Sequence, residues 1–439
     1  MIIDRSWRSV RQLVCKPAKK FDKMPKETST FVSERNALIR EYERTGKTWY
    51  RLMGADVPLT GHRNKALTNL LLQAVSEGWD YYASETNWLQ EYLEAVTIFE
   101  KKHRGAKYAA DDVLAVPGVA SGLQLIHNVM LDPGDEIVVI EPSHYASGPC
   151  SYMWYLGAKP VQVPCFEDRE WEPDLDRLRA SITERTKAIA LDHPNNPTGA
   201  IYSRKARKEI VDIAGEHDIP IISDEMYSLI AFDGNEAPTM ALDADDVPVI
   251  VTHSFSKFFM MPGWRMGYLC FHDPEGKIVD IKNVCKKINA TYGHNSSGIP
   301  LPILVAATRA LREYTDASME VAGAMATKGP MDESKEMVRK LQVRRDYTYK
   351  RISDIRGISV VNSKASLYMF PKVHGIGKTW KTTEEFILQL LKEEAVGFHP
   401  GDQYGNTGFG HFRTLVLNDI PTLEEVYNRL ERFLIRHSR

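Results

Sequence analysis

The chain has 439 residues, a length that suits one large domain with an appendage or two domains. Hydrophobic residues make up 43% and charged residues 26%, as in ordinary globular enzymes, and the formal net charge is -2. This balance gives no electrostatic reason to expect a nucleic acid or an anionic membrane surface as a partner. The 5 cysteines are widely spaced and never form C-x-x-C, which argues against a disulfide framework or a zinc site.

The chain shows no apolar run that is long enough to cross a bilayer. A basic stretch over residues 5–26 lacks the apolar core of a secretory signal, and we interpret it as a surface arm. We therefore expect a cytoplasmic protein without a metal site.

From about residue 110 to 275, short apolar runs of strand length alternate with helical patterns. The expected strands are 114–116, 136–140, 188–191, 219–223, 249–252 and 268–271, and the expected helices include 121–130 and 205–217. Runs that are apolar on both faces and separated by helix-sized segments indicate a mostly parallel sheet covered by helices. The sequence therefore predicts an α/β domain here.

After residue 300 the pattern changes. Residues 302–314 and 332–351 predict long helices, 358–361, 366–370 and 413–417 predict strands, and 422–435 predicts an amphipathic helix. We expect a large domain over residues 61–300 and a smaller α+β domain over 301–439. Residues 1–60 are expected to form an N-terminal arm and part of the small domain.

The strongest local signal is the segment S-F-S-K that ends at Lys257. It directly follows an expected strand, which places Lys257 at the carboxyl edge of the sheet, where open α/β sheets bind ligands. A lysine there could be a solvated surface residue. The neighbouring Phe255 and Phe258 favour a functional role, because they would desolvate the amine and favour the uncharged form that Schiff-base chemistry needs. Arg265 follows eight residues later, and its planar fork suits a phosphate.

Asp224 comes at the end of another expected strand. A lone aspartate at this place is most simply a helix N-cap. With Lys257 nearby, the alternative is an ion pair with a pyridinium nitrogen, because a buried carboxylate keeps such a nitrogen protonated and makes the ring an electron sink. Tyr227, three residues further on, could donate a hydrogen bond to a phenolate oxygen of the same ring.

Two loops complete the candidate site. Asn196 lies in the segment N-N-P-T-G at 195–199, which could be an ordinary turn or a rigid presentation of a side-chain amide at the sheet edge. Ala120 and Ser121 lie between an expected strand and an expected helix. Backbone N–H groups at such a point can cradle an anion, or the segment can be a simple turn.

Taken together, these segments resemble the aminotransferases of class I/II, the aspartate-aminotransferase-like branch of pyridoxal 5'-phosphate (PLP) enzymes of fold type I. The matched motifs are N-N-P-T-G at 195–199, S-D-E-x-Y at 223–227, S-F-S-K and G-W-R-x-G within 254–267, and H-F-R at 411–413. Each motif alone is moderate, but their order and spacing from about residue 80 to 417 make the set specific. The resemblance implies the PLP-transferase fold, an α/β large domain with a mostly parallel sheet between helices plus a smaller α+β domain.

The resemblance also implies a role for each matched residue. Lys257 would carry PLP as a Schiff base and act with Asp224, the partner of the pyridinium nitrogen. Asn196 and Tyr227 would contact the ring oxygen. The residues expected to hold the phosphate are Ala120, Ser121, Ser254 and Arg265.

Further residues are expected to bind the substrate or to reach a second subunit. Arg413 would bind the substrate α-carboxylate, with Asn196 and Gly54 close by. Tyr82 resembles a tyrosine that reaches the phosphate of the neighbouring subunit, so a homodimer is expected. An aromatic residue should stack on the ring soon after Pro142; spacing indicates His144, an aromatic preference indicates Tyr145, and we favour Tyr145.

The activity implied is transfer of an α-amino group between an amino acid and a 2-oxo acid. Two alternatives stay open at this point. One is another PLP reaction on an amino acid, such as β- or γ-elimination or replacement, cyclisation or decarboxylation. The other is a nucleotide-binding protein, for which G-K-T at 377–379 is a hint, although Lys372 stands where a P-loop needs glycine.

The sequence departs from the family pattern at residues 364–368, where K-A-S-L-Y replaces a more usual glycine-bearing approach to the pocket. No family motif places a second arginine for a distal carboxylate. We therefore expect a neutral or aromatic amino donor, with a side-chain pocket near Gly54, Tyr81 and Tyr292.

Overall fold

The computed structural model describes residues 29–54, 61–148, 150, 153–291, 297–313 and 328–437. The basic stretch over residues 5–26 and Tyr292 lie outside these residues.

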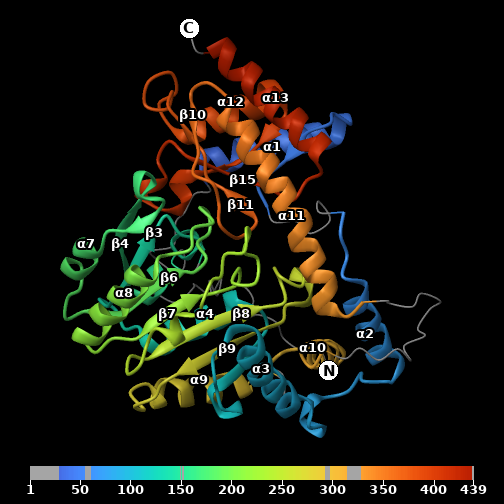
Figure 1. The fold of residues 1–439 in the computed structure, drawn as a ribbon, viewed down its shortest axis with the longest axis vertical. Helices are drawn as coiled ribbons and strands as arrows, with labels where there is room; N and C mark the ends of the chain where they lie inside the picture. Colours follow the sequence, from blue (N-terminus) through green and yellow to red (C-terminus); the bar gives the residue numbers. More distant parts are fainter. Residues whose placement is uncertain are drawn as a thin grey trace, which may run out of the picture.

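An 8-stranded sheet forms the centre of the larger part of the molecule (Figure 1). The strands, in spatial order, are β2 (Val113–Val116), β9 (Gly267–His272), β8 (Val249–Ser254), β7 (Ile221–Asp224), β6 (Thr186–Asp192), β3 (Glu136–Glu141), β4 (Lys159–Phe166) and β5 (Glu172–Pro173). The pairs from β8 to β4 are parallel, whereas β9 is antiparallel to β2 and β8, and β5 is antiparallel to β4. The predicted mostly parallel sheet is therefore confirmed.

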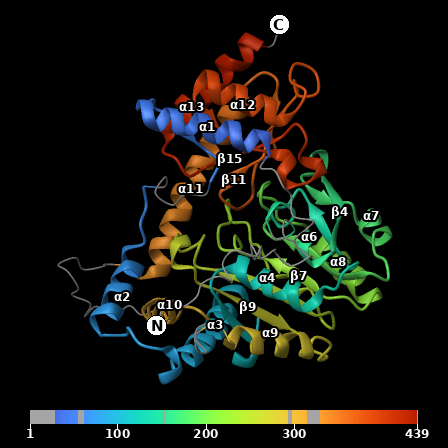
Figure 2. The same cartoon turned by 180° about the vertical axis from the view of Figure 1, so that it is seen from behind.

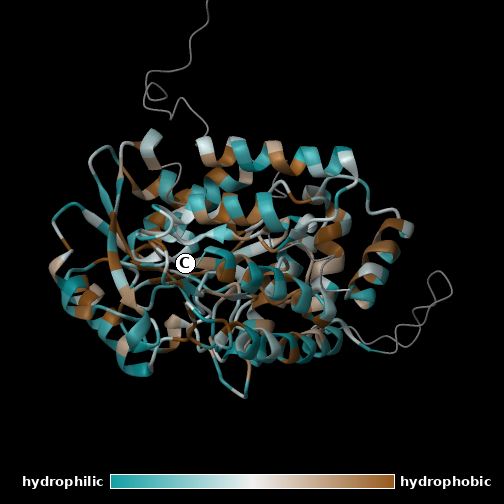
Figure 3. Ribbon diagram, turned by 90° about the horizontal axis from the view of Figure 1, so that it is seen from above, coloured by the Kyte–Doolittle hydropathy of each residue, from teal (hydrophilic) through white to brown (hydrophobic). Residues whose placement is uncertain are grey.

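Alternate side chains of the strands face two different cores. In β6, Ala188 and Ala190 belong to the same core as residues of α4 (Val119–Met130) and α9 (Val279–Thr291). Ile189 and Leu191 face the opposite core with residues of α3 (Trp88–Arg104) and α8 (Arg204–Glu216). Helices thus cover both faces of the sheet, as the back view also shows (Figure 2). Many helices carry polar and apolar residues side by side, as amphipathic surface helices do (Figure 3).

A smaller α+β part packs beside this sheet. It contains α11 (Pro330–Ser353), α12 (Thr383–Glu394) and α13 (Ile420–His437), and a 3-stranded sheet in the order β11 (Tyr368–Met369), β15 (Phe412–Leu415) and β14 (His399–Pro400). β10 (Ile358–Ser359) pairs with β12 (Lys372–Val373). Among the helices of the described ranges, none combines the length and the apolar character needed to cross a membrane.

The described N-terminal segment, residues 29–54, packs against the C-terminal part of the chain. β1 (Tyr50–Arg51) pairs in parallel with β13 (Val396–Gly397), and α1 (Thr30–Thr45) packs against α12, whose other side contacts α13 (Figures 1 and 2).

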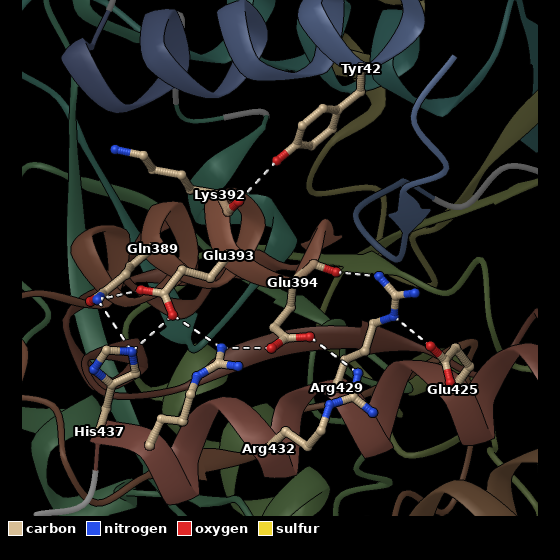
Figure 4. Close-up of polar contacts among 10 residues, drawn as sticks. Tyr42, Gln389, Lys392, Glu393, Glu394, Glu425, Arg429, Arg432 and His437 are labelled. Atoms are coloured by element: carbon tan, nitrogen blue, oxygen red, sulfur yellow. Dashed lines mark hydrogen bonds and ion pairs between the residues drawn. The ribbon is translucent and has the colours of Figure 1, made fainter. Parts of the chain in front are cut away.

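Polar contacts hold this junction together at the end of α12 (Figure 4). The Tyr42 hydroxyl donates to the Leu391 carbonyl at 2.7 Å, and Arg429 Nη1 donates to the Glu394 carbonyl at 2.8 Å. The Leu391 carbonyl also accepts the Ala395 backbone N–H at 2.9 Å, and the Glu394 carbonyl is one of those that the end of a helix leaves without an intrahelical partner. Arg436 adds ion pairs to the carboxylates of Glu394 at 2.6 Å and Glu393 at 3.1 Å.

The remaining helices are α2 (Lys65–Ser76), α5 (His144–Ser147), α6 (Met153–Leu156), α7 (Leu175–Ala180) and α10 (Leu301–Leu311). Helix α10 corrects one expectation, because it packs against α2 and α3 of the larger part although residues from 301 onward were expected in the small domain. The reason is its composition: eight of its residues are buried, including Leu304, Val305 and Ala306, so it needs covering helices on several sides.

Candidate active site

The candidate residues gather at the carboxyl end of the parallel strands. Asp224 is the last residue of β7, Ser254 is the last residue of β8, and Asn196 lies in the loop after β6. Ala120 lies in the first turn of α4, directly after β2. Because parallel neighbours end at the same edge, the topology brings these distant parts of the sequence to one place.

A cavity of about 470 Å³ opens at this edge. The predicted residues that line it are Ala120, Ser121, Asp224, Lys257 and Arg265. His144, Met226 and Ser256 also line it, and its volume suits a small organic cofactor. Ser254 is buried just behind the wall, where its hydroxyl accepts a hydrogen bond from the Ser256 backbone N–H at 3.2 Å.

Lys257 enters this cavity from a loop that is anchored by aromatic residues. Phe255, Phe258 and Phe259 are all buried, and the rings of Phe255 and Phe259 stack with centroids 4.8 Å apart. The Lys257 Nζ lies 5.9 Å from the centre of the Tyr227 ring. The apolar anchor fixes the loop while the amine reaches the polar cavity.

Asp224 is a buried carboxylate that also lines the cavity. Its Oδ1 accepts hydrogen bonds from Thr252 Oγ1 at 3.1 Å and from the Met226 backbone N–H at 3.4 Å. Burial raises the pKa of Asp224 to about 6, although these hydrogen bonds and the Lys257 charge act in the other direction. A cation placed against this carboxylate would offset the cost of burying its charge.

The far end of the cavity has the features of an anion cradle. Arg265 has a backbone φ of 50°, and its Nη1 donates to the Pro262 carbonyl at 2.8 Å. Its guanidinium lies against Gly118, where an added Cβ would come within 2.1 Å of Arg265 Nη2. Gly118 also has a φ of 86°, so only glycine fits this close approach. The cationic fork beside the N-terminus of α4 suits a phosphate group.

Tyr227 and Asn196 meet beside Lys257, and neither residue belongs to the lining of the cavity described above. Asn196 Nδ2 lies 3.5 Å from the Tyr227 hydroxyl, at the limit of a hydrogen bond. Burial and the neighbouring Tyr368 raise the pKa of Tyr227 well above its usual value, so its hydroxyl keeps its proton at neutral pH. Asn196 also connects to Arg413, because Arg413 Nη1 donates to its Oδ1 at 3.0 Å.

Arg413 is a buried cation held by neutral groups. Its Nη2 donates to the Met53 carbonyl at 2.7 Å, and its Cζ lies 4.2 Å from the centre of the Tyr368 ring. In the part of the chain that the structure describes, no carboxylate forms an ion pair with Arg413, and its Nε has no hydrogen-bond partner. A buried arginine in this state has a fork ready for an incoming carboxylate. Gly54 directly follows Met53 and is half-buried.

The two residues considered for stacking on the ring lie differently. Tyr145 is fully buried, its hydroxyl contacts His127 Nε2, and it does not line the cavity. His144 lines the cavity instead, and its backbone N–H donates to Asp192 Oδ2 at 2.7 Å. The expectation rested on aromatic character, whereas the backbone direction of the short helix α5 decides which side chain faces the site. Burial, with the charges of Arg413 and Lys257, lowers the pKa of His144 to about 3, so its imidazole is neutral at pH 7.

Tyr82 does not face this cavity. Its side chain is 62% exposed and borders a separate open hollow with residues 298–302.

Three residues that contribute to the site were not assigned a role from the sequence motifs. Met53 supplies only a backbone carbonyl, which has no sequence signature. Asp192 pairs in register with Asp224 on the neighbouring strand, and it holds the start of α5 through Ser143 Oγ at 3.0 Å. Tyr368 contacts both Tyr227 and Arg413, and the unusual segment at 364–368 was the available signal.

The comparisons with known proteins agree with this geometry. Residues 59–430 match the family described as aminotransferase class I and II. The chain is 29% identical over 363 residues to an aspartate aminotransferase of Pyrococcus horikoshii, covering 82% of this chain and 85% of that protein. It is 30% identical over 365 residues to aromatic-amino-acid aminotransferase 2 of Thermococcus litoralis, covering 82% and 86%.

A solved structure has a similar overall fold. Alanine aminotransferase from Pyrococcus furiosus superposes with a TM-score of 0.84 and 36% sequence identity, covering 96% of this chain and 100% of that one. The lysine, the buried carboxylate and the arginine cradle around one cavity fit the cofactor of this family. The chain belongs to the class I and II aminotransferases and is a PLP-dependent enzyme that transfers amino groups.

Proposed function

We propose that this aminotransferase takes the α-amino group from an amino acid with an uncharged side chain and gives it to a 2-oxo acid. The observation that carries the proposal is Arg413, a buried guanidinium whose described hydrogen bonds go only to the uncharged oxygens of Asn196 and Met53. Leaving such a cation buried without an anion is costly, and an α-carboxylate provides the matching two-pronged partner.

The cationic residues that line the cavity are the reason to expect an amino donor with an uncharged side chain. Lys257 and Arg265 are the lysine and arginine side chains among its described lining, and both are assigned to the cofactor. A distal carboxylate of the donor would thus find no partner among these lining residues. The similarity to an alanine aminotransferase structure supports a small neutral donor.

PLP, when bound, supplies an electron sink for the electrons that the departing α-proton leaves behind. Lys257 Nζ takes this proton from the substrate α-carbon and delivers it again on the same side of the site. Asp224 would hold the cofactor through its ring nitrogen, because a buried carboxylate there favours the charged form of that nitrogen. Arg413 fixes the α-carboxylate and so the orientation of the bond that breaks.

His144 is the residue that we propose to lie against the cofactor ring, in place of Tyr145. Its neutral imidazole provides a flat polar surface without adding a further positive charge beside Lys257 and Arg413. The hydrogen bond of its backbone to Asp192 holds the start of α5 in place. Ala120, Ser121, Ser254 and Arg265 are proposed as the phosphate ligands.

The active unit is proposed to be a homodimer. Tyr82 projects from the surface, and the hollow beside it is lined mainly by apolar residues such as Ile299 and Leu301. An exposed tyrosine at an apolar hollow suits contact with a second subunit. The cytoplasmic location expected from the sequence stays a prediction.

Borohydride reduction of the purified protein tests the central residue. We expect a cofactor absorption band that reduction fixes covalently, with the label on Lys257 after peptide mapping. Lys257→Ala should bind PLP without the covalent link and lose at least about 1000-fold in turnover. A label on another lysine would contradict the assignment.

A screen of the twenty amino acids tests the donor. Single additions, without an oxo acid, should convert the cofactor band to that of the aminated cofactor and release one equivalent of 2-oxo acid. Neutral amino acids should react best, and aspartate as the best donor would overturn the proposed specificity. Release of ammonia or carbon dioxide would indicate elimination or decarboxylation instead of transamination.

Mixed dimers test the role of Tyr82. Lys257→Ala and Tyr82→Ala chains should each be impaired alone, and their mixture should regain activity in hybrid dimers that contain one intact site. A monomer that is fully active at assay concentration would rule out the homodimer.

A further inference from the structure

We propose that Tyr368 is a positioning residue that orients the Tyr227 hydroxyl toward the cofactor and supports the Arg413 guanidinium at the same time. This inference rests on the proposed function, and it gives a role to the unusual segment at 364–368.

The backbone around Tyr368 is attached to the loops of the larger part that carry the site. Lys364 and Ala365 donate their backbone N–H groups to the Gly199 carbonyl, both at 3.0 Å, and Gly199 closes the loop that contains Asn196. Ser366 N–H donates to the carbonyl of residue 230, three positions after Tyr227, at 2.8 Å. The segment from the small part is therefore fixed to the two loops that carry Asn196 and Tyr227.

Ser366 shows how firmly this segment is held. Its φ is 75°, in the left-handed region that favours glycine, although it is serine. Such a conformation persists only where the surroundings impose it. Tyr368 follows two residues later and is 2% exposed, so its side chain has little freedom to turn away.

The Tyr368 side chain contacts both halves of the site. Its hydroxyl lies 2.9 Å from the Tyr227 hydroxyl, and its ring lies beneath Arg413 with 4.2 Å between Cζ and the ring centre. The guanidinium gains from the negative face of the ring. One side chain thus contacts the proposed donor to the ring oxygen and the proposed carboxylate ligand.

The charges around the Tyr368 hydroxyl support the same placement. Burial would raise the pKa of Tyr368, but the positive charges of Lys257 and Arg413, with hydrogen bonds to Tyr227 and Lys257, lower it overall. The hydroxyl therefore lies in the positive field of the site.

The direction of the hydrogen bond follows from counting protons. A hydroxyl has one proton, so when Tyr227 donates to the ring oxygen, the bond between the two tyrosines must be donated by Tyr368. The pair then forms a chain from Tyr368 through Tyr227 to the cofactor. Such chains polarise each successive hydroxyl and strengthen the last bond. Tyr368 raises the donor strength of Tyr227 without itself touching the cofactor ring.

Tyr368→Phe removes the hydroxyl and keeps the ring beneath Arg413. With Tyr227 a weaker donor, the ring oxygen becomes more basic and holds the Schiff-base proton of the Lys257-bound cofactor more tightly. The absorbance of the Lys257-bound cofactor changes with pH, and the midpoint of this change should rise by about 0.5 to 1 pH unit. The kcat should fall roughly 3- to 10-fold. The KM for the amino acid should stay within about twofold, whereas Tyr368→Leu, which also removes the ring, should raise KM.

A double-variant cycle with Tyr227→Phe separates positioning from a general effect. If Tyr368 acts through Tyr227, adding Tyr368→Phe to Tyr227→Phe should not move the midpoint further. Tyr427→Phe is the matched control. It also removes a buried tyrosine hydroxyl of the small part, one that lies 2.9 Å from Thr414 Oγ1, and it should leave the midpoint unchanged.

An unchanged midpoint in Tyr368→Phe would overturn the proposal, and so would a shift that persists in the Tyr227→Phe background. The midpoint is measured without substrate, so it separates this proposal from the proposed function. A wild-type protein that shows the cofactor band but converts no amino acid would overturn the function alone.

Discussion

The cofactor cavity around Lys257 and the carboxylate site around Arg413 are joined through Asn196, yet they are built in different ways. The cofactor side takes its side chains from loops and turns directly after strands of one sheet. The carboxylate side combines β15, the second residue after β1 and the start of β11. Its bond between Arg413 and the Met53 carbonyl joins residues 360 positions apart.

This difference has a functional meaning. A strand end is fixed by the sheet itself, so each cofactor residue can act as a separate unit. The carboxylate site depends on the docking of the small part, so its residues are coupled to one another. We therefore expect changes on the cofactor side to alter the chemistry or PLP binding, and changes on the carboxylate side to alter substrate binding as well.

Asp224→Asn should have the largest effect and tests the cofactor side. Removing the partner of a buried charge costs about 3–5 kcal/mol, which corresponds to roughly 10²- to 10⁴-fold in kcat. Steady-state kinetics should show little change in KM. A large rise in KM would contradict the distinction between the two sides of the site, because Asp224 would then act on substrate binding.

The same variant should stabilise the protein without its cofactor. The folded-state pKa of about 6 exceeds the unfolded value of about 3.9, so this carboxyl contributes stability that is full below pH 4 and is lost as the pH rises through 6. At pH 8 the wild type should be less stable than Asp224→Asn by up to about 3 kcal/mol. Thermal unfolding of the cofactor-free proteins should show this gap at pH 8 and none at pH 4. Asp243→Asn, another buried aspartate, is the control outside the cavity.

Arg413→Lys is the matching test of the carboxylate side. Lysine keeps the charge but loses the two-pronged fork, so kcat/KM should fall roughly 10- to 100-fold for every amino acid. KM should rise and kcat should fall, in contrast to the cofactor-side variant. An effect confined to one donor would mean that Arg413 contacts the side chain of the substrate. Arg207→Lys, a buried arginine paired with Asp243 at 2.6 Å, controls for the loss of a buried guanidinium.

Gly118→Ala should have the smallest effect and sharpens the account of the phosphate end. The new methyl group would collide with Arg265 Nη2, and overpacking of about 1–2 kcal/mol should weaken PLP binding roughly 5- to 30-fold. Reconstitution of the cofactor-free protein with PLP measures this change. Gly134→Ala is the control, since Gly134 has a φ of 103° and nothing within 4 Å of an added Cβ. Equal losses of PLP binding in both variants would mean that the strained backbone angle φ causes the effect, and not a collision with Arg265.

The sequence allowed more to be predicted on the cofactor side than on the carboxylate side. Asp224 ends one strand and Lys257 closely follows another, both revealed by local apolar runs, while Arg265 lies just before a third strand, and the structure brings all three to one cavity. The preference for Tyr145 over His144 rested on residue type, which cannot show which way a one-turn helix faces, and His144 is the one that lines the cavity. The contacts of Tyr368 with Tyr227 and Arg413 depend on the docking of two parts, which no local pattern encodes.

The placement of α1 against α12 has a consequence for how the chain is made. Tyr42 and its partner Leu391 lie 349 residues apart, so α1 leaves the ribosome long before the helix that will cover it. At roughly 5–20 residues per second, α1 waits about 17 to 70 s without its partner. During that time the faces of α1 that carry Phe31 and Tyr42 meet solvent or a chaperone, and the small part becomes complete only after the last helix, α13, has been synthesised.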